Sequence, residues 1–262
     1  MLLLGPWQLP PGPAGDDALK AQAPLSMAER VLARSGEFLG EPYTESPLGE
    51  GAEPDPDPRL RFDAFDCLTY TETVLALARS TSVSDVEPNL DRIRYSGEPS
   101  WAHRNHVMEA NWIPNAISSG WLKDVTRAVG GARVRRVHKK LDAAAWSSAQ
   151  GRALHLAASE RAQGTYAIDI VPVAEAEAVL RRAPAGLVVT VVRKDRPASV
   201  TRISHVGFLV QTPRGPALRH ASRTHHRVVD EPVHAFLKRN LDFGAWTIEG
   251  LSLYEPLPPV TR

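Results

Sequence analysis

Cysteine is the scarcest informative residue in this sequence, since Cys67 is the only one in 262 residues. A single cysteine excludes an internal disulfide and leaves too few thiolates for a structural zinc site built from cysteines. The formal net charge of +1 gives no reason to expect nucleic acid or an anionic membrane as a partner. The sequence also lacks the roughly eighteen continuous apolar residues that a membrane-spanning helix needs.

What is present has the composition of a globular protein, with 43% hydrophobic and 23% charged residues. Residues 1–25 are rich in proline, glycine and alanine, which predicts a flexible N-terminal arm. The short apolar start of this arm lacks the basic residues of a signal peptide, so the arm is compatible with the end of a longer leader. We expect residues 26–262 to form one domain.

Cys67 lies where an irregular approach, rich in proline and aspartate, gives way to a helical pattern. Apolar side chains at residues 74–78 are spaced as an amphipathic helix requires. Asp66 is a suitable N-cap, which places Cys67 in the first turn, where unpaired N–H groups and the helix dipole favour an anion. This position predicts a thiol with a lowered pKa, and hence a nucleophile. The alternative is a small buried side chain without chemistry.

The sequence predicts helices first and strands afterwards, which is an α+β order. Ser26 and Glu29 form a capping box that starts a helix, and residues 85–129 are predicted to be helix and loop. Residues 131–164 are basic and then alanine-rich, and we expect them to be helical, with the basic run on a solvated face. Runs of β-branched residues then predict an antiparallel meander, with strands at residues 166–172, 187–192, 203–210, 217–222, 227–230 and 245–254.

A polar cluster with two tryptophans occupies residues 101–112. It indicates the wall of a cleft, and the alternative is a solvated helix that its tryptophans anchor. His103, His106 and Glu109 follow one another at intervals of three, but without a fourth ligand we expect no metal site.

Two histidines, His205 and His220, fall inside predicted strands that a turn at residues 213–215 joins. Neighbouring antiparallel strands can place two side chains together on one face of a sheet. A helix packed on that face would bring Cys67 to His205, which gives a thiol, an imidazole and a second imidazole to orient the first. The alternative is that both histidines are ordinary core residues.

Four short motifs resemble, in their order along the chain, those of the NlpC-type cell-wall cysteine peptidases. The residues after Cys67, with residues 104–106 (RNH) and 111–114 (NWIP), resemble the N-acetylmuramoyl-L-alanine amidase-like branch of that superfamily. The resemblance runs from about residue 28 to residue 256. The four motifs are residues 40–43 (GEPY), 65–67 (FDC), 204–208 (SHVGF) and 219–222 (RHAS).

This resemblance implies a papain-like core, in which the helix that carries the nucleophile packs on an antiparallel sheet, with extra N-terminal and central helices. It implies Cys67 as the nucleophile, His205 as the general base and His220 as the group that orients His205, with no metal or cofactor. The implied activity is hydrolysis of an amide bond in the peptidoglycan stem. That bond is either the MurNAc–L-Ala amide or the D-Glu–diamino acid bond.

Substrate contacts follow from the same resemblance. Tyr43 would line the site and help to stabilise the oxyanion, and Asp66 and Ser204 are similar to residues that bind the free amine of a murein peptide in some relatives. The side chains considered for binding the acidic, amide-rich stem are Arg104, Glu109, Asn111, Trp112 and Arg219.

The expected partners are therefore peptidoglycan or murein peptide fragments, with no nucleic acid and no membrane span. We expect a monomer that acts in the periplasm or after secretion. Two other functions stay open at this point. One is a catalytically silent module that binds the cell wall or a partner protein, and the other is a secreted antibacterial toxin with the same chemistry.

Overall fold

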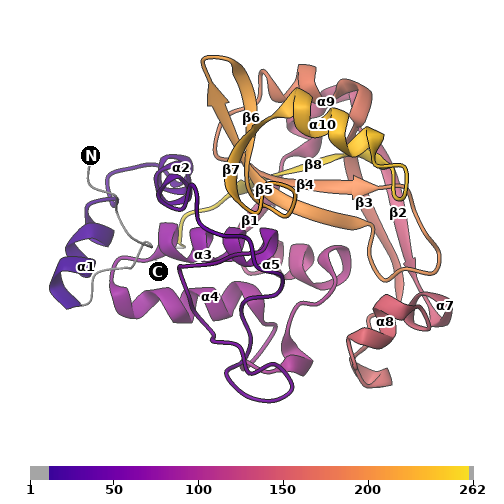
Figure 1. The fold of residues 1–262 in the computed structure, drawn as a ribbon, viewed down its shortest axis with the longest axis horizontal. Coiled ribbons are helices and arrows are strands. Elements are labelled where there is room, and N and C mark those ends of the chain that lie inside the picture. Colours follow the sequence, from indigo (N-terminus) through magenta and orange to yellow (C-terminus); the bar gives the residue numbers. More distant parts are fainter. Residues whose placement is uncertain (1–11, 260–262) are drawn as a thin grey trace.

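A computed structural model describes residues 12–259 of the chain as a layer of helices followed by a large antiparallel sheet (Figure 1). The strand order is β2-β3-β8-β4-β5-β6-β7, and β1 pairs with β8. The predicted antiparallel sheet is confirmed, and β4 to β7 follow one another as a meander, but the last strand, β8, lies between β3 and β4 instead of at the edge. The strands are β1 Leu122–Asp124, β2 Arg135–Leu141, β3 Gly164–Pro172, β4 Val188–Arg193, β5 Ile203–Thr212, β6 Gly215–Ser222, β7 Arg227–Pro232 and β8 Ile248–Pro256.

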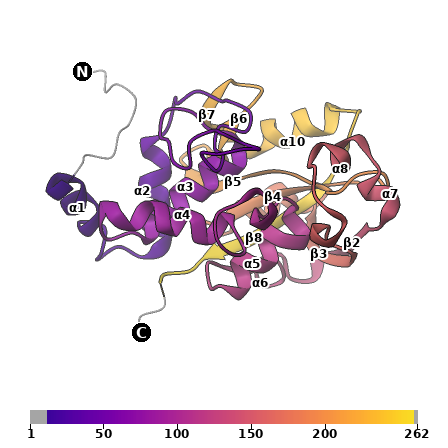
Figure 2. The same cartoon turned by 90° about the horizontal axis from the view of Figure 1, so that it is seen from below.

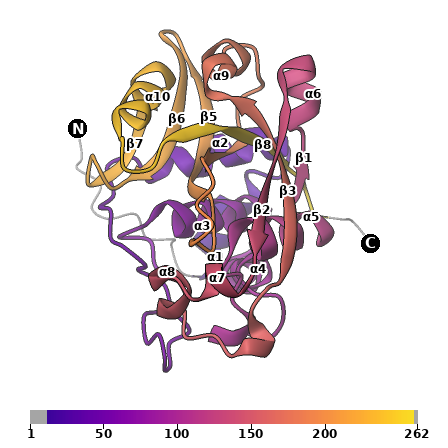
Figure 3. The same cartoon turned by 90° about the vertical axis from the view of Figure 1, so that its right-hand side faces the viewer.

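Helices cover both faces of this sheet, which explains why every residue of β4 is buried (Figure 3). On β5, Val206 and Phe208 face the core beneath α2 and α3, whereas Leu209 faces the core beneath α9 and α10. The helices are α1 Gly12–Lys20, α2 Met27–Glu37, α3 Cys67–Arg79, α4 Val86–Arg94, α5 Ile113–Ser118, α6 Thr126–Gly130, α7 Ala143–Trp146, α8 Ala149–Ala153, α9 Val173–Leu180 and α10 Val233–Asp242.

Helix α3 lies at the centre of the core beneath α2, and its start is fixed by Asp66 as the N-cap, as predicted, within a capping box that Thr69 completes. The Asp66 carboxylate accepts a hydrogen bond from the Thr69 N–H at 2.7 Å, and the Thr69 hydroxyl accepts one from the Asp66 N–H at 3.0 Å. All ten residues from Thr69 to Ala78 are buried, because α3 packs between α2, α4 and the strands β5 and β6. A helix enclosed in this way holds the position of its first residue, Cys67, firmly.

The prediction of a flexible arm is wrong for residues 12–25. Residues 1–11, which include the apolar start that we related to a leader, lie outside the described residues. Leu19, in the last turn of α1, is fully buried in the core beneath α2 and α3. Gln22 donates hydrogen bonds to the carbonyl oxygens of Leu77 and Ser80 at the end of α3. These long-range contacts, which proline and glycine content does not reveal, fix the segment against α3.

The predicted helix over the basic run is also wrong, because these residues form β2. Seven residues of β2 pair with β3 in antiparallel register. Lys139, which we expected on a solvated face, is fully buried, and its ammonium donates to Asp195 and to the carbonyl of Arg196. The alanine-rich part does form α7 and α8, at the end of the molecule opposite α1 (Figure 2). Among the described residues, no helix is both long and apolar enough to cross a membrane.

Candidate active site

Cys67 lies where strands β5 and β6 stop pairing with each other. Their ladder begins at Phe208 and Arg219 and runs toward the hairpin turn, whereas β6 stays paired with β7 as far as Ser222. The half-buried thiol lies beside β5 at this point, where a hydrogen bond from the backbone N–H of Val206 favours the charged form of the sulfur. The N–H groups of Cys67 itself and of Leu68, in the first turn of α3, also favour a thiolate there. The residue before Val206 is His205.

His205 begins a line of hydrogen bonds that leads away from the thiol. Its Nε2 lies 2.6 Å from Nδ1 of His220, and Nε2 of His220 lies 3.1 Å from Oε2 of Glu231. Arg239 on α10 then donates to both oxygens of Glu231, at 3.1 and 2.6 Å. We call these four residues the imidazole network. The ring of Phe236 packs against both imidazoles.

The imidazole network fixes which ring nitrogens carry protons. Arg239 and His220 hold the Glu231 carboxyl in its charged form, lowering its pKa to about 2 against the opposing effect of burial, so Glu231 only accepts hydrogen bonds. Nε2 of His220 must therefore carry a proton. Burial lowers the pKa of His220, so its ring is neutral and Nδ1 is bare. Nε2 of His205 then donates to it, which leaves Nδ1 of a neutral His205 as an unprotonated base.

A glycine permits this arrangement of the two rings. If the β5–β6 register is continued, Gly207 lies opposite His220. A Cβ on Gly207 would lie 2.7 Å from the Arg219 carbonyl oxygen and 2.8 Å from Cβ of His220. Only glycine fits such a close approach. The glycine of the sequence SHVGF is thus explained by the position of the second histidine.

The expected lowering of the Cys67 pKa is wrong. Burial, and then the neighbouring Asp66 carboxylate, raise the pKa of the thiol to about 12, and the backbone N–H groups only partly oppose this. Burial and His220 hold the pKa of His205 well below its usual value. The resting pair is therefore a neutral thiol and a neutral imidazole, and the helix start does not by itself produce a thiolate.

Cys67, His205 and His220 line one open pocket of about 760 Å³, which we call the Cys67 pocket. Tyr43 and Ser204, both predicted to contact substrate, line the same pocket. Tyr43 is placed by a bridge to Phe65, just before α3, and burial raises the pKa of its hydroxyl to about 12. The hydroxyl therefore stays protonated and can donate a hydrogen bond into the pocket.

Comparison with known proteins adds to this geometry. The model of the N-acetylmuramoyl-L-alanine amidase-like family matches residues 33–244. The chain belongs to this family. No curated protein sequence matches it.

Two solved structures share the fold of this amidase-like protein. A Legionella pneumophila protein is 24% identical, with a TM-score of 0.78 over 93% of this chain and 94% of its own. An N-acetylmuramoyl-L-alanine amidase of Bacteroides uniformis is 20% identical, with a TM-score of 0.70 over 87% of this chain and 98% of its own. At these identities, the comparison establishes the fold alone.

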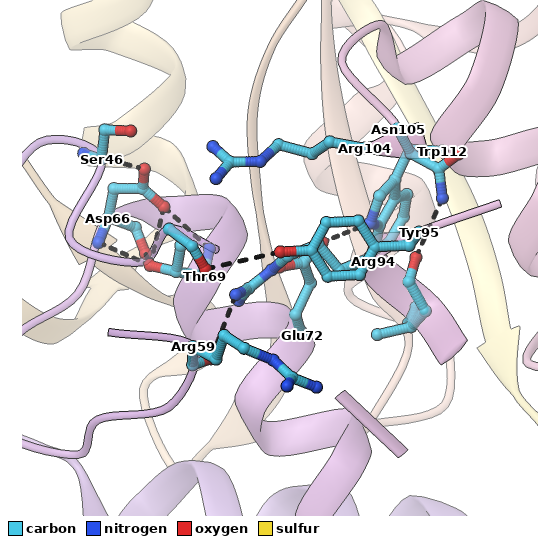
Figure 4. Close-up of polar contacts among 12 residues, drawn as sticks. Ser46, Arg59, Asp66, Thr69, Glu72, Arg94, Tyr95, Arg104, Asn105 and Trp112 are labelled. Atoms are coloured by element: carbon cyan, nitrogen blue, oxygen red, sulfur yellow. Dashed lines mark hydrogen bonds and ion pairs between the residues drawn. The ribbon is translucent and has the colours of Figure 1, made fainter. Parts of the chain in front are cut away.

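Asp66 and Arg104 of the amidase-like protein line a second pocket, of about 200 Å³, beyond the start of α3. Figure 4 shows the Arg104 side chain extended toward Asp66 and Thr69, with Glu72 and Arg94 below it. Arg104 is held by Glu50 and Asp55 and lies over the ring of Trp101. Asp66 directly precedes Cys67 in the chain, but both of these predicted residues line a pocket other than the Cys67 pocket.

The other predicted contacts do not line the Cys67 pocket and have partners elsewhere. Trp112 is fully buried and donates to Glu72, and Glu109 accepts from the Thr201 hydroxyl and the Arg202 N–H. Asn111 accepts from the Val107 N–H within its own turn. Arg219 pairs with Asp230 on the face of the sheet that α2 covers. His103 and His106 bond to separate carbonyl oxygens, so they do not converge with Glu109.

The sequence interpretation missed three residues of the amidase-like protein that line or support the Cys67 pocket: Arg193, Glu231 and Arg239. Glu231 directly follows the predicted strand 227–230, and an acidic residue on the strand next to a histidine was an available signal. Arg193 and Arg239 gave no comparable signal, because one ends a strand and the other lies on a helix that was not predicted.

Proposed function

We propose that this protein is a cysteine hydrolase that cleaves an amide bond in the stem of peptidoglycan. One observation carries the proposal: a half-buried thiol and an oriented, unprotonated imidazole share an open pocket of about 760 Å³. Membership of the amidase-like family supports the substrate class and favours the MurNAc–L-Ala amide as the bond that is cut. The D-Glu–diamino acid bond is the alternative.

In the first step, Nδ1 of His205 takes the proton of the Cys67 thiol as the sulfur attacks the amide carbonyl carbon. This is general-base activation of a neutral thiol, in keeping with the raised pKa of Cys67 and the lowered pKa of His205. The new positive charge on His205 is stabilised through His220 by the Glu231 carboxylate. The papain-like arrangement expected from the sequence motifs is consistent with these roles.

The tetrahedral oxyanion then needs hydrogen-bond donors close to Cys67. The backbone N–H of Cys67, at the start of α3, and the Tyr43 hydroxyl are the donors that we propose. His205 gives its proton to the leaving amine, which breaks the C–N bond and leaves a thioester on Cys67. Water, activated by the same imidazole, hydrolyses the thioester and restores the thiol.

Ser204 lies beside His205 in the same pocket and is proposed to contact the substrate. Asp66 and Arg104 would act on a part of the stem that extends into the second pocket. Because peptidoglycan lies outside the cytoplasmic membrane, we propose that the protein acts in the periplasm or after secretion.

The test is digestion of purified murein by the full chain, with Cys67→Ala and His205→Ala as variants. Each substitution should lower the rate by on the order of 10⁴ or more, because the nucleophile and its base act as a unit. Mass spectrometry of the products separates the two bonds, since only MurNAc–L-Ala cleavage releases the whole peptide stem. Circular dichroism checks that both variants fold. Undiminished cleavage by Cys67→Ala, or no cleavage by the wild type, overturns the proposal.

A further inference from the structure

Arg193, at the end of β4, is a buried cation in the wall of the Cys67 pocket that has no carboxylate partner among residues 12–259. Only 8% of the residue is exposed. Its Nε donates to the Ser204 hydroxyl at 2.6 Å, its Nη2 donates to Oδ1 of Asn240 at 2.7 Å, and its Nη1 donates to the carbonyl oxygen of Trp246. All three acceptors are neutral. Buried charges are normally paired with an opposite charge, so this one requires an explanation.

The neighbouring charges do not neutralise Arg193. Arg239 and Arg196 both act on it as like charges and help burial to lower its pKa. Arg239 is itself paired with Glu231, and Asp242, which also lines the pocket, pairs with Lys238. The described charges therefore leave an excess of positive charge at this end of the Cys67 pocket.

The Arg193 guanidinium is also held in a fixed orientation with donors to spare. Its aromatic neighbours are Phe243 and Trp246, whose ring centroids lie 5.5 and 5.8 Å from Cζ. Asn240 cannot turn away, because its Nδ2 donates to the carbonyl oxygen of Phe236. A guanidinium has five N–H groups, and the hydrogen bonds named above use three. The two that remain, one on each Nη atom, match the two oxygens of a carboxylate.

We propose that Arg193 binds a carboxylate of the substrate, namely the free carboxylate of the D-Glu residue in the peptide stem. This inference rests on the proposed function. Arg193 contacts Ser204, the residue before the proposed base His205, so the bound group would lie close to the scissile bond. The D-Glu carboxylate is the stem carboxylate nearest to the MurNAc–L-Ala bond, and it belongs to the residue that forms the acyl side of the D-Glu–diamino acid bond. One extended residue spans only about 3.3–3.6 Å, so the D-Glu carboxylate lies within one or two residue lengths of either candidate bond.

The experiment compares MurNAc-tripeptide whose D-Glu carboxyl is free with the same compound carrying a carboxamide there. For the wild type, we expect kcat/KM to be about 10- to 100-fold higher for the acid, since an Arg–carboxylate contact is charge-assisted and bidentate. In Arg193→Gln the ratio of kcat/KM for the acid to kcat/KM for the carboxamide should fall to about 1, because activity on the acid is lost. Arg193→Lys, which keeps the charge but not the fork, should retain part of it.

Arg196→Gln is the matched control, because it removes an equal charge near Arg193 from an exposed residue that does not line the pocket. Arg196→Gln should keep most of the preference for the acid. This result would separate direct contact with Arg193 from the effect of any positive charge near the pocket. Equal rates of the wild type on acid and amide would overturn the inference while leaving the hydrolase intact. Cleavage of neither compound would instead count against the proposed function. If Arg193→Gln fails to fold, the wild-type comparison and Arg193→Lys still decide, and an unchanged preference in Arg193→Lys would contradict bidentate binding.

Discussion

Strands β6 and β7 share two contacts between a side chain and a carboxylate, which are adjacent in sequence and lie on opposite faces of the sheet. On one face, Arg219 donates to both oxygens of Asp230, at 2.7 and 2.8 Å. On the other face, the next residue of each strand takes part, and His220 contacts Glu231 at 3.1 Å. Both carboxylates belong to β7 and both partners to β6. What differs is the element that each contact leads to.

The Arg219 contact ends in packing, because the remaining Nη1 donates to the Leu32 carbonyl oxygen and the Ser35 hydroxyl on α2. The His220 contact ends at His205 and the Cys67 pocket. Arginine keeps its charge at any relevant pH, whereas an imidazole can take up and release a proton. A buried contact to a carboxylate is therefore a functional candidate when its partner is titratable and leads to a pocket, rather than because it is buried.

Among the substitutions that test this comparison of the two contacts, the largest effect should come from Glu231→Gln, which keeps the size of the side chain and removes its charge. Glu231 raises the pKa of both His220 and His205, so its loss lowers both pKa values further. His205 becomes a weaker base and its positive charge in the transition state is less stabilised. We expect kcat/KM at pH 7 to fall about 10- to 100-fold, less than for a direct partner of the base.

The pH profile distinguishes this role from a structural one. The acid limb of kcat/KM reports the base of the free enzyme, so it should move to lower pH in Glu231→Gln. Arg193 and Arg239, which also act on His205, are unchanged in this variant. An acid limb that stays in place, or a rate at pH 7 equal to that of the wild type, would contradict the role of Glu231 in the imidazole network.

A smaller and different effect is expected from Asp230→Asn, the same chemical change one residue earlier. It removes one charge of a partly exposed bidentate pair, which should lower the free energy of unfolding by about 1–2 kcal/mol. The value of kcat should stay within about twofold of the wild type, because Arg219 does not line the Cys67 pocket. Urea unfolding and steady-state kinetics on the same preparation measure both. A large loss of kcat in the folded variant would show that the two faces are not independent.

The same pair of contacts indicates how far sequence alone can go. The strands were predictable, because their β-branched runs and turn residues are local signals, and so was the helix that Asp66 caps. The sequence motifs pointed to His205 and His220, but the assignment of Arg219 to substrate binding depended on which face of β6 the residue occupies. Register and face are set by long-range pairing, which a single sequence does not contain.

Burial caused the remaining errors. Lys139 was assigned to a solvated face because its run is basic, yet its amine is enclosed with Asp195 from a distant loop. The thiol of Cys67 was expected to be acidic because it starts a helix. A helix N-terminus is visible in a sequence, whereas desolvation by the surrounding elements is not, and here desolvation is the larger effect.

The smallest expected effect tests that last point directly. Asp66→Asn keeps a good N-cap and the acceptor for the Thr69 N–H, and it removes the carboxylate that raises the pKa of Cys67. At a fixed pH below that pKa, a fall of about half a unit gives roughly threefold more thiolate. The rate of alkylation by iodoacetamide should rise accordingly, and mass spectrometry reads it without ambiguity because Cys67 is the only cysteine. Asp63→Asn, which alters an exposed carboxylate paired with Arg61, is the matched control and should leave the rate unchanged.

In the wild type, the rate of alkylation should keep rising through the alkaline range, because a thiol with a raised pKa is mostly protonated at neutral pH. A plateau reached near neutral pH would mean that His205 already holds the proton in the resting protein, and the mechanism would then begin from an ion pair.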